Sequence, residues 1–201
     1  MTASRLIAAF IALVALIGVG WQFQLNGTIA QPLPWGPRAW GMLRYFTIIT
    51  NVLTVIVMAR VALGRQASAN LAVTLTLSII MVGIIYRLLL APAEPKLAPD
   101  WYPDFLMHVA VPVLVPLWWL GFADKTLRLA DIWIWLSLPA VYCVYALTRG
   151  WITATYPYFF LDIGRFGLPR VLLFCAGLVA VFAICALALR LVARLLTRRS
   201  A

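Results

Sequence analysis

The sequence predicts an all-α fold, a polytopic bundle of six transmembrane helices that forms a single integral-membrane domain over residues 1–201. Of the 201 residues, 65% are hydrophobic and 11% are charged, and the mean hydropathy is +0.99. Soluble domains carry about 25% charged residues, so this chain has too few polar side chains to cover a water-facing surface. Its apolar residues also gather in runs close to the roughly 20 residues that a helix needs to cross a bilayer.

Six apolar runs fit this length, and the connections between them are short and without repeats. The predicted spans are 5–22, 40–62, 70–91, 104–122, 131–148 and 169–195. The first run follows Arg5 and has the character of a signal peptide, but "GVGWQFQLNG" contains no convincing small-x-small cleavage site. We therefore expect a retained helix.

The basic residues set the predicted orientation, because cytoplasmic loops are enriched in Lys and Arg. With six spans, the side that holds both termini carries nine of the 16 basic residues: Arg5, Arg60, Arg65, Lys125, Arg128, Arg190, Arg194, Arg198 and Arg199. The other side carries the remaining seven: Arg38, Arg44, Arg87, Lys96, Arg149, Arg165 and Arg170. We therefore expect both termini in the cytoplasm.

The net charge of +10 and the three cysteines do not favour a soluble or metal-binding function. The charge is dispersed over the ends of apolar runs, where it meets lipid phosphates, and this pattern argues against nucleic-acid binding. Cys143, Cys175 and Cys185 lie inside apolar runs with neither disulfide nor zinc spacing. With one histidine and no carboxylate cluster, the sequence predicts no metal site and no cofactor.

Four polar residues interrupt the second apolar run, "LRYFTIITNVLTV". Thr47, Thr50, Asn51 and Thr54 are spaced i, i+3, i+4 and i+7, which places them on one face of a helix. Such residues often bond neighbouring helices or their own i−4 carbonyl, and this interpretation is favoured for Thr50 and Thr54. Thr47 lies three residues after Arg44, so we expect it about 5 Å below the outer boundary.

His108 is the only histidine of the chain, in "YPDFLMHVAVPVLVP". It comes four residues after Asp104, so it is also expected about one helical turn below the outer boundary. A buried histidine is often structural, but its depth matches that of Thr47. An ionisable group at this depth normally faces the bundle interior or a wet cavity. Pro112 and Pro116 should loosen the helix that follows and free backbone carbonyls.

Further polar and aromatic residues are predicted at the same outer end. The simplest interpretation is that the tyrosines lie in the headgroup region and that Arg87 extends its side chain to lipid phosphate. Alternatively, Arg87 pairs with Asp162 or recognises a lipid carboxylate. The predicted substrate-binding residues are Tyr86, Arg87, Tyr156, Tyr158 and Arg165.

These residues permit nucleophilic attack by a hydroxyl group. Thr47 would attack, and His108 would remove its proton and return it to the leaving group. Asp104 or Asp162 could orient the imidazole, and Asn51 or a backbone amide could stabilise the oxyanion. A site one turn inside the leaflet suits a lipid ester whose acyl chains stay in the bilayer.

The elements "YFTIITN", "FLMHVAVPVLVP" and "YPYFFLDIG", in this order on a six-span chain, resemble the androgen-induced and androgen-dependent TFPI-regulating membrane proteins and related bacterial membrane proteins. Animal members hydrolyse fatty acid esters of hydroxy fatty acids with a threonine nucleophile and a histidine. The resemblance places these roles on Thr47 and His108, and it matches the "YP-F-L-acid" element to residues 156–162. It implies a lipid ester hydrolase in a bacterial inner membrane.

Two other classes stay open. The first is a non-catalytic bundle that binds a lipid or small molecule, or a component of a transporter. Transporters often show internal repeats and broken helices near the midplane. The sequence shows no convincing repeat, and its polar groups lie towards one leaflet. The second class is a structural or assembly partner. The sequence shows no charged amphipathic face and no extramembrane domain that would favour it.

Overall fold

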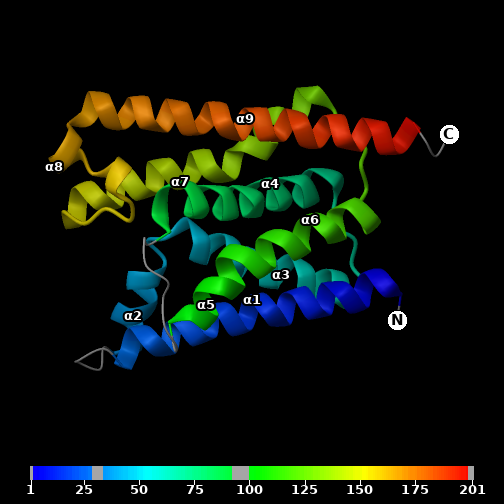
Figure 1. Ribbon diagram of the computed structural model, residues 1–201, viewed down its shortest axis with the longest axis horizontal. Helices are drawn as coiled ribbons and strands as arrows, with labels where there is room; N and C mark the ends of the chain where they lie inside the picture. The colour runs from blue at the N-terminus through cyan, green and yellow to red at the C-terminus, as the bar shows by residue number, and fades with distance from the viewer. Residues whose placement is uncertain (1, 29–33, 92–99, 199–201) are drawn as a thin grey trace. The chain divides into compact units, whose positions relative to one another are not determined.

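The computed structural model describes residues 2–28, 34–91 and 100–198, and every regular element in these ranges is a helix (Figure 1). The predicted all-α fold class is confirmed to this extent. Lys96 and Arg199, which contribute to the predicted orientation, lie outside the described residues. Contacts divide the chain into two compact units, Met1–Ser68 with Ser78–Asp124, and Ala69–Leu77 with Lys125–Ala201. The single domain over 1–201 stays a prediction.

The first unit holds most of the elements that matter for the site. Its helices are α1 (Ala3–Thr28), α2 (Trp35–Met42), α3 (Phe46–Ala62), the second half of α4 (Ala69–Ile85), η1 (Tyr86–Leu90), α5 (Trp101–Phe105), η2 (Leu106–Ala110) and α6 (Val111–Phe122). The second unit holds the first half of α4, η3 (Leu129–Asp131), α7 (Ile132–Thr153), η4 (Phe159–Leu161), α8 (Ile163–Phe166) and α9 (Leu168–Arg198).

Five of the six predicted spans correspond to helical segments that are long and apolar enough to cross a membrane. They cover Ala3–Asn26, Ala69–Leu90, Trp101–Phe122, Leu129–Thr153 and Leu168–Arg198. The ends predicted from hydropathy therefore differ from the observed ends by only a few residues in most cases. The protein is an integral membrane protein by the length and composition of its helices.

The span predicted over 40–62 is not one straight helix, because α2 and α3 meet at an angle of 100°. Taken together, α2 and α3 are long and apolar enough to form a sixth, broken span. Tyr45 between them is extended, with φ −93° and ψ 132°, and its carbonyl accepts the N–H groups of Ile48 and Ile49. Met42 and Ile48 both pack in a buried cluster with Met107. In an unbroken helix Met42 and Ile48 would point about 120° apart, so packing on Met107 favours the bend.

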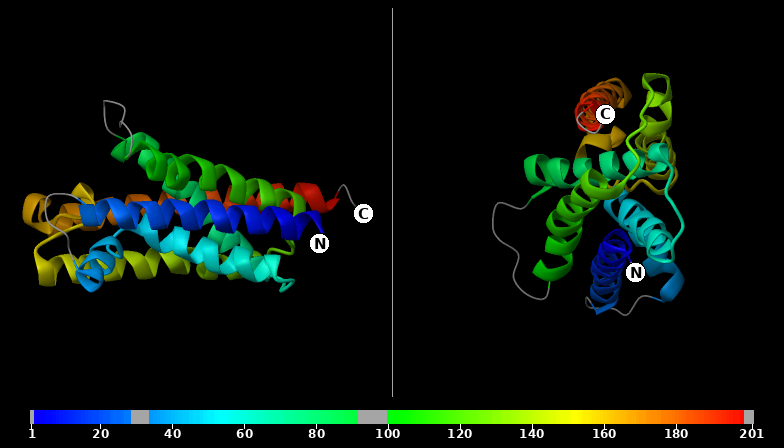
Figure 2. Two further views of the ribbon diagram at one scale, coloured as in Figure 1. Left: turned by 90° about the horizontal axis from the view of Figure 1, so that it is seen from below. Right: turned by 90° about the vertical axis from the view of Figure 1, so that its right-hand side faces the viewer.

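Helices α1 and α3 lie side by side and run in opposite directions (Figure 2). Arg5, in the first turn of α1, donates its Nε–H to the carbonyl of Ala62 at the end of α3, at 2.9 Å. The indole N–H of Trp118, near the end of α6, donates to the hydroxyl of Ser4 at 3.2 Å. One end of the first unit is therefore made by the start of α1 and the ends of α3 and α6.

Two π-helical turns interrupt the helices of the first unit, and each lies just before a proline. In η2 the N–H of Val111 bonds Leu106, five residues back, and Pro112 has no N–H to offer to His108. In η1 the N–H of Ala91 bonds Tyr86 at 2.7 Å, and Pro92 follows. The loosening expected from Pro112 thus takes the form of a π turn. Such turns occur frequently at functional sites.

In the second unit, the segment after α7 folds back onto its own helix. Ala154 has a left-handed backbone with φ 51°, which turns the chain. The ring of Tyr156 then lies so close to Gly150 that a Cβ there would meet the ring at 2.2 Å. Only glycine permits this contact, so Gly150 fixes the position of the loop on α7.

Candidate functional site

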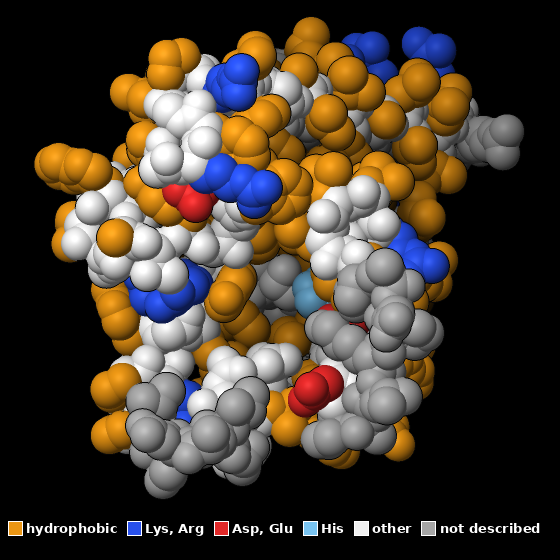
Figure 3. All heavy atoms as spheres, turned by 60° about the vertical axis from the view of Figure 1, so that its left-hand side comes forward, with side chains coloured by type: hydrophobic (Ala, Val, Ile, Leu, Met, Phe, Trp, Pro, Cys, Tyr) orange, Lys and Arg blue, Asp and Glu red, His pale blue; other side chains and the backbone are white. Residues whose placement is uncertain are grey.

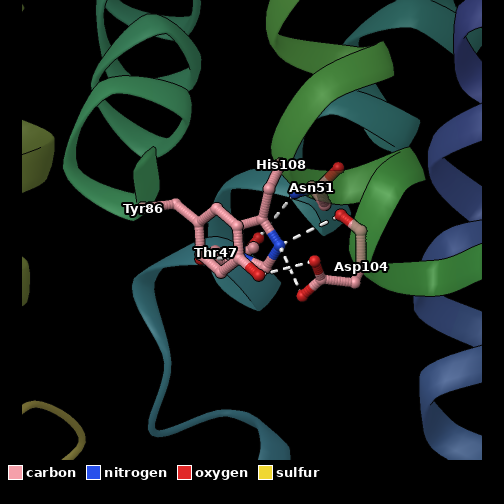
Figure 4. Close-up of polar contacts among 5 residues, drawn as sticks. All are labelled: Thr47, Asn51, Tyr86, Asp104 and His108. Atoms are coloured by element: carbon pink, nitrogen blue, oxygen red, sulfur yellow. Dashed lines mark hydrogen bonds and ion pairs between the residues drawn. The ribbon is translucent and has the colours of Figure 1, made fainter. Parts of the chain in front are cut away.

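Thr47 and His108 are in contact in the first unit (Figure 4). The hydroxyl Oγ1 of Thr47 lies 3.3 Å from Nε2 of His108, although 61 residues separate them in the chain. Thr47 comes from the first turn of α3, and His108 from the π turn η2. A distance at the long end of the hydrogen-bond range is common for catalytic pairs without substrate.

The other imidazole nitrogen faces Asp104. His108 Nδ1 lies 3.1 Å from the backbone carbonyl of Asp104 and 3.3 Å from its carboxylate oxygen Oδ1. Both of these oxygens are acceptors, so the proton of the neutral ring belongs on Nδ1. Nε2 is then a lone-pair acceptor for the hydroxyl proton of Thr47, which is the tautomer that a general base requires.

Tyr86 connects to both residues of this arrangement. Its hydroxyl donates to Oδ2 of Asp104 at 2.6 Å, and its ring stacks on the imidazole of His108 with centroids 3.8 Å apart. The Asp104 carboxylate therefore bridges a tyrosine and a histidine, one oxygen to each. The bridge restrains the rotation of Asp104, and the stacked ring restrains the imidazole plane.

The first turn of α3 supplies a favourable electrostatic setting for Thr47. It is the second residue of the helix, where backbone N–H groups have no partner within the helix. These groups and the helix dipole place partial positive charge beside the hydroxyl, which favours an alkoxide or an oxyanion there. This setting depends on the bend between α2 and α3, since a continuous helix would have no N-terminus at this point.

The other polar residues of α3 hold its backbone. Thr50 donates to the carbonyl of Phe46 at 2.8 Å, and Thr54 donates to Thr50 at 2.8 Å, as predicted for both. Asn51 donates its amide to the carbonyl of Thr47 at 2.8 Å and is fully buried. Its Oδ1 has no hydrogen-bond partner among the described residues. This geometry suits support of the Thr47 backbone better than direct contact with a substrate.

Two glycines allow close packing around η2. A Cβ added at Gly83 would lie 3.0 Å from Pro112 Cβ and 3.4 Å from the carbonyl oxygen of His108. A Cβ added at Gly18 would lie 3.0 Å from the Met107 side chain. The π turn that carries His108 therefore packs closely against the backbone of α1 at Gly18 and against the backbone of α4 at Gly83.

The site is accessible from outside the protein. The side chains of His108 and Asp104 are 14% and 15% exposed, and Thr47 is 9% exposed. In Figure 3 part of the histidine, in pale blue, is visible beside an acidic side chain in red.

Of the remaining predicted site residues, one lies in the first unit and four lie in the second. Arg87 is the next residue of η1 after Tyr86, and it is exposed. Asp162, Tyr156, Tyr158 and Arg165 belong to the second unit. There, Asp162 caps α8 by accepting the backbone N–H of Arg165 at 3.1 Å, and the Arg165 guanidinium lies over the Phe166 ring. Oδ1 of Asp162 is therefore used to cap the N-terminus of α8.

Sequence reasoning gave Tyr86 a role in substrate binding and missed its contact with Asp104. It also gave no role to Arg149, which is only 6% exposed and donates to the hydroxyl of Tyr145 at 2.6 Å. No pattern in the sequence signals the contact of Tyr86 with Asp104, because 18 residues separate them. In the described part of the chain, no three His, Cys, Asp or Glu side chains lie close enough to share a metal ion.

In comparisons with known proteins, no family model, no curated protein and no solved structure matches this chain.

Proposed function

We propose that this protein is a membrane-embedded hydrolase that cleaves fatty-acyl esters of lipids, with Thr47 as nucleophile and His108 as general base. The observation that carries the proposal is the connected set Thr47–His108–Asp104–Tyr86. A hydroxyl, a base with a free Nε2 and a carboxylate on Nδ1 are the three parts of a nucleophilic acyl-transfer site.

The first half of the reaction transfers the acyl group to the enzyme. Oγ1 of Thr47 attacks the ester carbonyl carbon while Nε2 of His108 takes the hydroxyl proton. The tetrahedral intermediate then collapses, the bond to the ester oxygen breaks, and His108 gives its proton to the leaving alcohol. The products of this half are an acyl-threonine and an alcohol, and His108 is neutral again.

The second half returns the enzyme to its starting state. A water molecule donates a proton to Nε2 of His108 and attacks the acyl-threonine carbonyl. Collapse of this intermediate returns the proton to Oγ1 of Thr47 and releases the fatty acid. In both halves Asp104 holds Nδ1–H and stabilises the imidazolium that forms, and Tyr86 holds Asp104 in place.

The negative charge of the tetrahedral intermediate falls beside the first turn of α3. The backbone N–H of Thr47 and the positive end of the α3 dipole are the groups that we assign to the oxyanion. Asn51 supports them, because its amide group bonds the carbonyl of Thr47. An enzyme with donors already in place has little reorganisation to do when charge develops.

A fatty-acyl ester is the substrate class that fits a site on apolar spans. The spans that carry Thr47, Tyr86 and His108 are lined outside by large apolar side chains such as Leu88 and Val113. The family resemblance of the sequence points to the same chemistry. We place both termini in the cytoplasm and the site near the outer leaflet of a bacterial inner membrane, as the distribution of basic residues favours.

Labelling with an alkyl fluorophosphonate tests the proposal on purified protein. Such probes react with activated hydroxyl nucleophiles, so wild type should label and both Thr47→Ala and His108→Ala should lose at least about tenfold in labelling rate. Thr54→Ala is the matched control, since it removes a buried threonine hydroxyl that bonds only its own helix. The proposal fails if the two site variants label as well as Thr54→Ala.

A further inference from the structure

A second candidate binding site lies at the other end of the first unit. A cavity of about 450 Å³ opens there between the start of α1, the segment after α3 and the end of α6. Its lining contains both charged and aromatic side chains: Arg5, Arg65, Gln66, Trp118, Phe122 and Asp124. Thr47 precedes Val61, which also lines the cavity, by 14 residues of α3, or about 21 Å.

The backbone holds Arg5 in a defined position at this cavity. The Nε–H of Arg5 donates to the carbonyl of Ala62, and this bond caps the C-terminal end of α3. Gly64 has φ 91°, and a Cβ at this residue would lie 3.3 Å from the guanidinium carbon of Arg5. The guanidinium therefore lies close to Gly64. Its two terminal nitrogens carry four N–H groups without a partner among the described residues.

Further donors line the same cavity. The Arg65 side chain is exposed and makes no hydrogen bond or ion pair within the described residues. Ser4 accepts the indole N–H of Trp118, so its own hydroxyl proton stays free to be donated. Two guanidinium groups outweigh the single carboxylate of the lining, Asp124. The cavity is therefore a cationic, donor-rich pocket.

One side of the cavity is apolar, which restricts the class of ligand further. Trp118 is buried, and Val61 and Phe122 complete an apolar side next to the two arginines. Arginine forks match phosphate oxygens in geometry and charge. An amphiphile with a phosphate headgroup would contact both halves of this lining.

We propose that the cavity binds a phosphate group, carried by an anionic lipid headgroup or free in solution. The proposal is independent of the hydrolase, because it uses none of the residues of the Thr47–His108 set. In the orientation proposed above, this end of the first unit faces the cytoplasm. The ligand would bridge α1, α3 and α6 at their ends and hold them together.

Binding can be measured by native mass spectrometry of the full chain released from neutral phosphatidylcholine nanodiscs, with phosphatidylglycerol added in steps. Arg65→Gln removes one guanidinium without breaking any contact of the fold, so it should weaken binding by about tenfold. Arg60→Gln is the matched control, because Arg60 is exposed, lies at the same end of α3 and does not line the cavity. It should bind as wild type does.

Inorganic phosphate distinguishes the two sources. If it displaces phosphatidylglycerol, and raises the unfolding temperature of wild type and Arg60→Gln but not of Arg65→Gln, the ligand is a soluble phosphate and the site stands. If phosphatidylglycerol alone shows this dependence on Arg65, the ligand is a lipid headgroup. Equal binding of both probes to Arg65→Gln and Arg60→Gln overturns the proposal. Equal unfolding temperatures of the two variants without ligand exclude a folding defect.

Discussion

Replacing Tyr86 by phenylalanine tests how the site is held together. The variant keeps the ring that stacks on His108 at 3.8 Å and deletes only the hydroxyl that donates to Asp104 Oδ2 at 2.6 Å. The imidazole therefore keeps its aromatic neighbour, and the carboxylate loses one of its restraints. We expect slower ester hydrolysis by a protein that is folded as before.

The size of the effect follows from the bond that is lost. A hydrogen bond to a charged group contributes about 1.5–3 kcal/mol. If all of it served to hold Asp104 in the transition state, the rate would fall about 10- to 150-fold. Asp104 keeps its contacts with Nδ1 of His108, so we expect the lower end, about tenfold in kcat, with little change in KM.

The assay is hydrolysis of a fluorogenic fatty-acyl ester by purified protein in detergent micelles, with a double-mutant cycle. Asp104→Asn should lose more than Tyr86→Phe, and the double variant should lose no more than Asp104→Asn, because both changes break the same interaction. Tyr102→Phe is the matched control, since this tyrosine is 45% exposed and stacks on Trp21 away from the site. Strictly additive losses, or a Tyr86→Phe variant as active as Tyr102→Phe, would refute the reasoning.

Three further predictions concern the support of the site. Asn51→Ala should reduce kcat by less than about tenfold if Asn51 only supports the backbone. Loss of a direct oxyanion donor would reduce kcat by about 10²–10³-fold, and the same hydrolysis assay distinguishes the two results. Gly83→Ala should lower the free energy of unfolding by about 1–3 kcal/mol through overpacking against Pro112, while Gly121→Ala, with nothing within 4 Å, should be neutral or slightly stabilising in a denaturation experiment. Pro112→Ala restores an N–H donor for the His108 carbonyl, so we expect η2 to relax towards α-helix and fluorophosphonate labelling to slow; unchanged labelling would show that the π turn is not needed.

Hydropathy was enough to predict most of the spans, because each apolar run must find lipid or other apolar side chains wherever it packs. Thr50 and Thr54 were expected to bond either a neighbouring helix or their own i−4 carbonyl, and the structure shows the i−4 bonds. Depth along a helix gave the pairing of Thr47 with His108 as a hypothesis, since both were expected about one turn inside the same boundary. Local properties of the chain carry these inferences.

Long-range packing decided what the sequence could not predict. The bend before α3 depends on the contact of Met42 and Ile48 with Met107, more than 50 residues away. Asp104 and His108 are spaced i, i+4, so helical spacing allowed their contact, but it could not exclude Asp162 as the neighbour of His108. The hydrogen bond from Tyr86 to Asp104 could not be predicted for a similar reason, because it joins two helices that are 18 residues apart in the chain.

The short length of α3 has a consequence for the membrane around it. Its 17 residues span about 26 Å, against about 30 Å for the hydrocarbon core of a typical bilayer. With α3 upright, α2 lies nearly in the membrane plane at 100° to it, and its Trp35 and Trp40 are 79% and 53% exposed, as side chains of the headgroup region are. We therefore expect the leaflet beside α2 to thin locally, which would bring ester groups and water down to the level of Thr47. Hydrolysis should then depend on the acyl-chain length of the host bilayer, and thicker membranes should slow the reaction even though every residue of the site is unchanged.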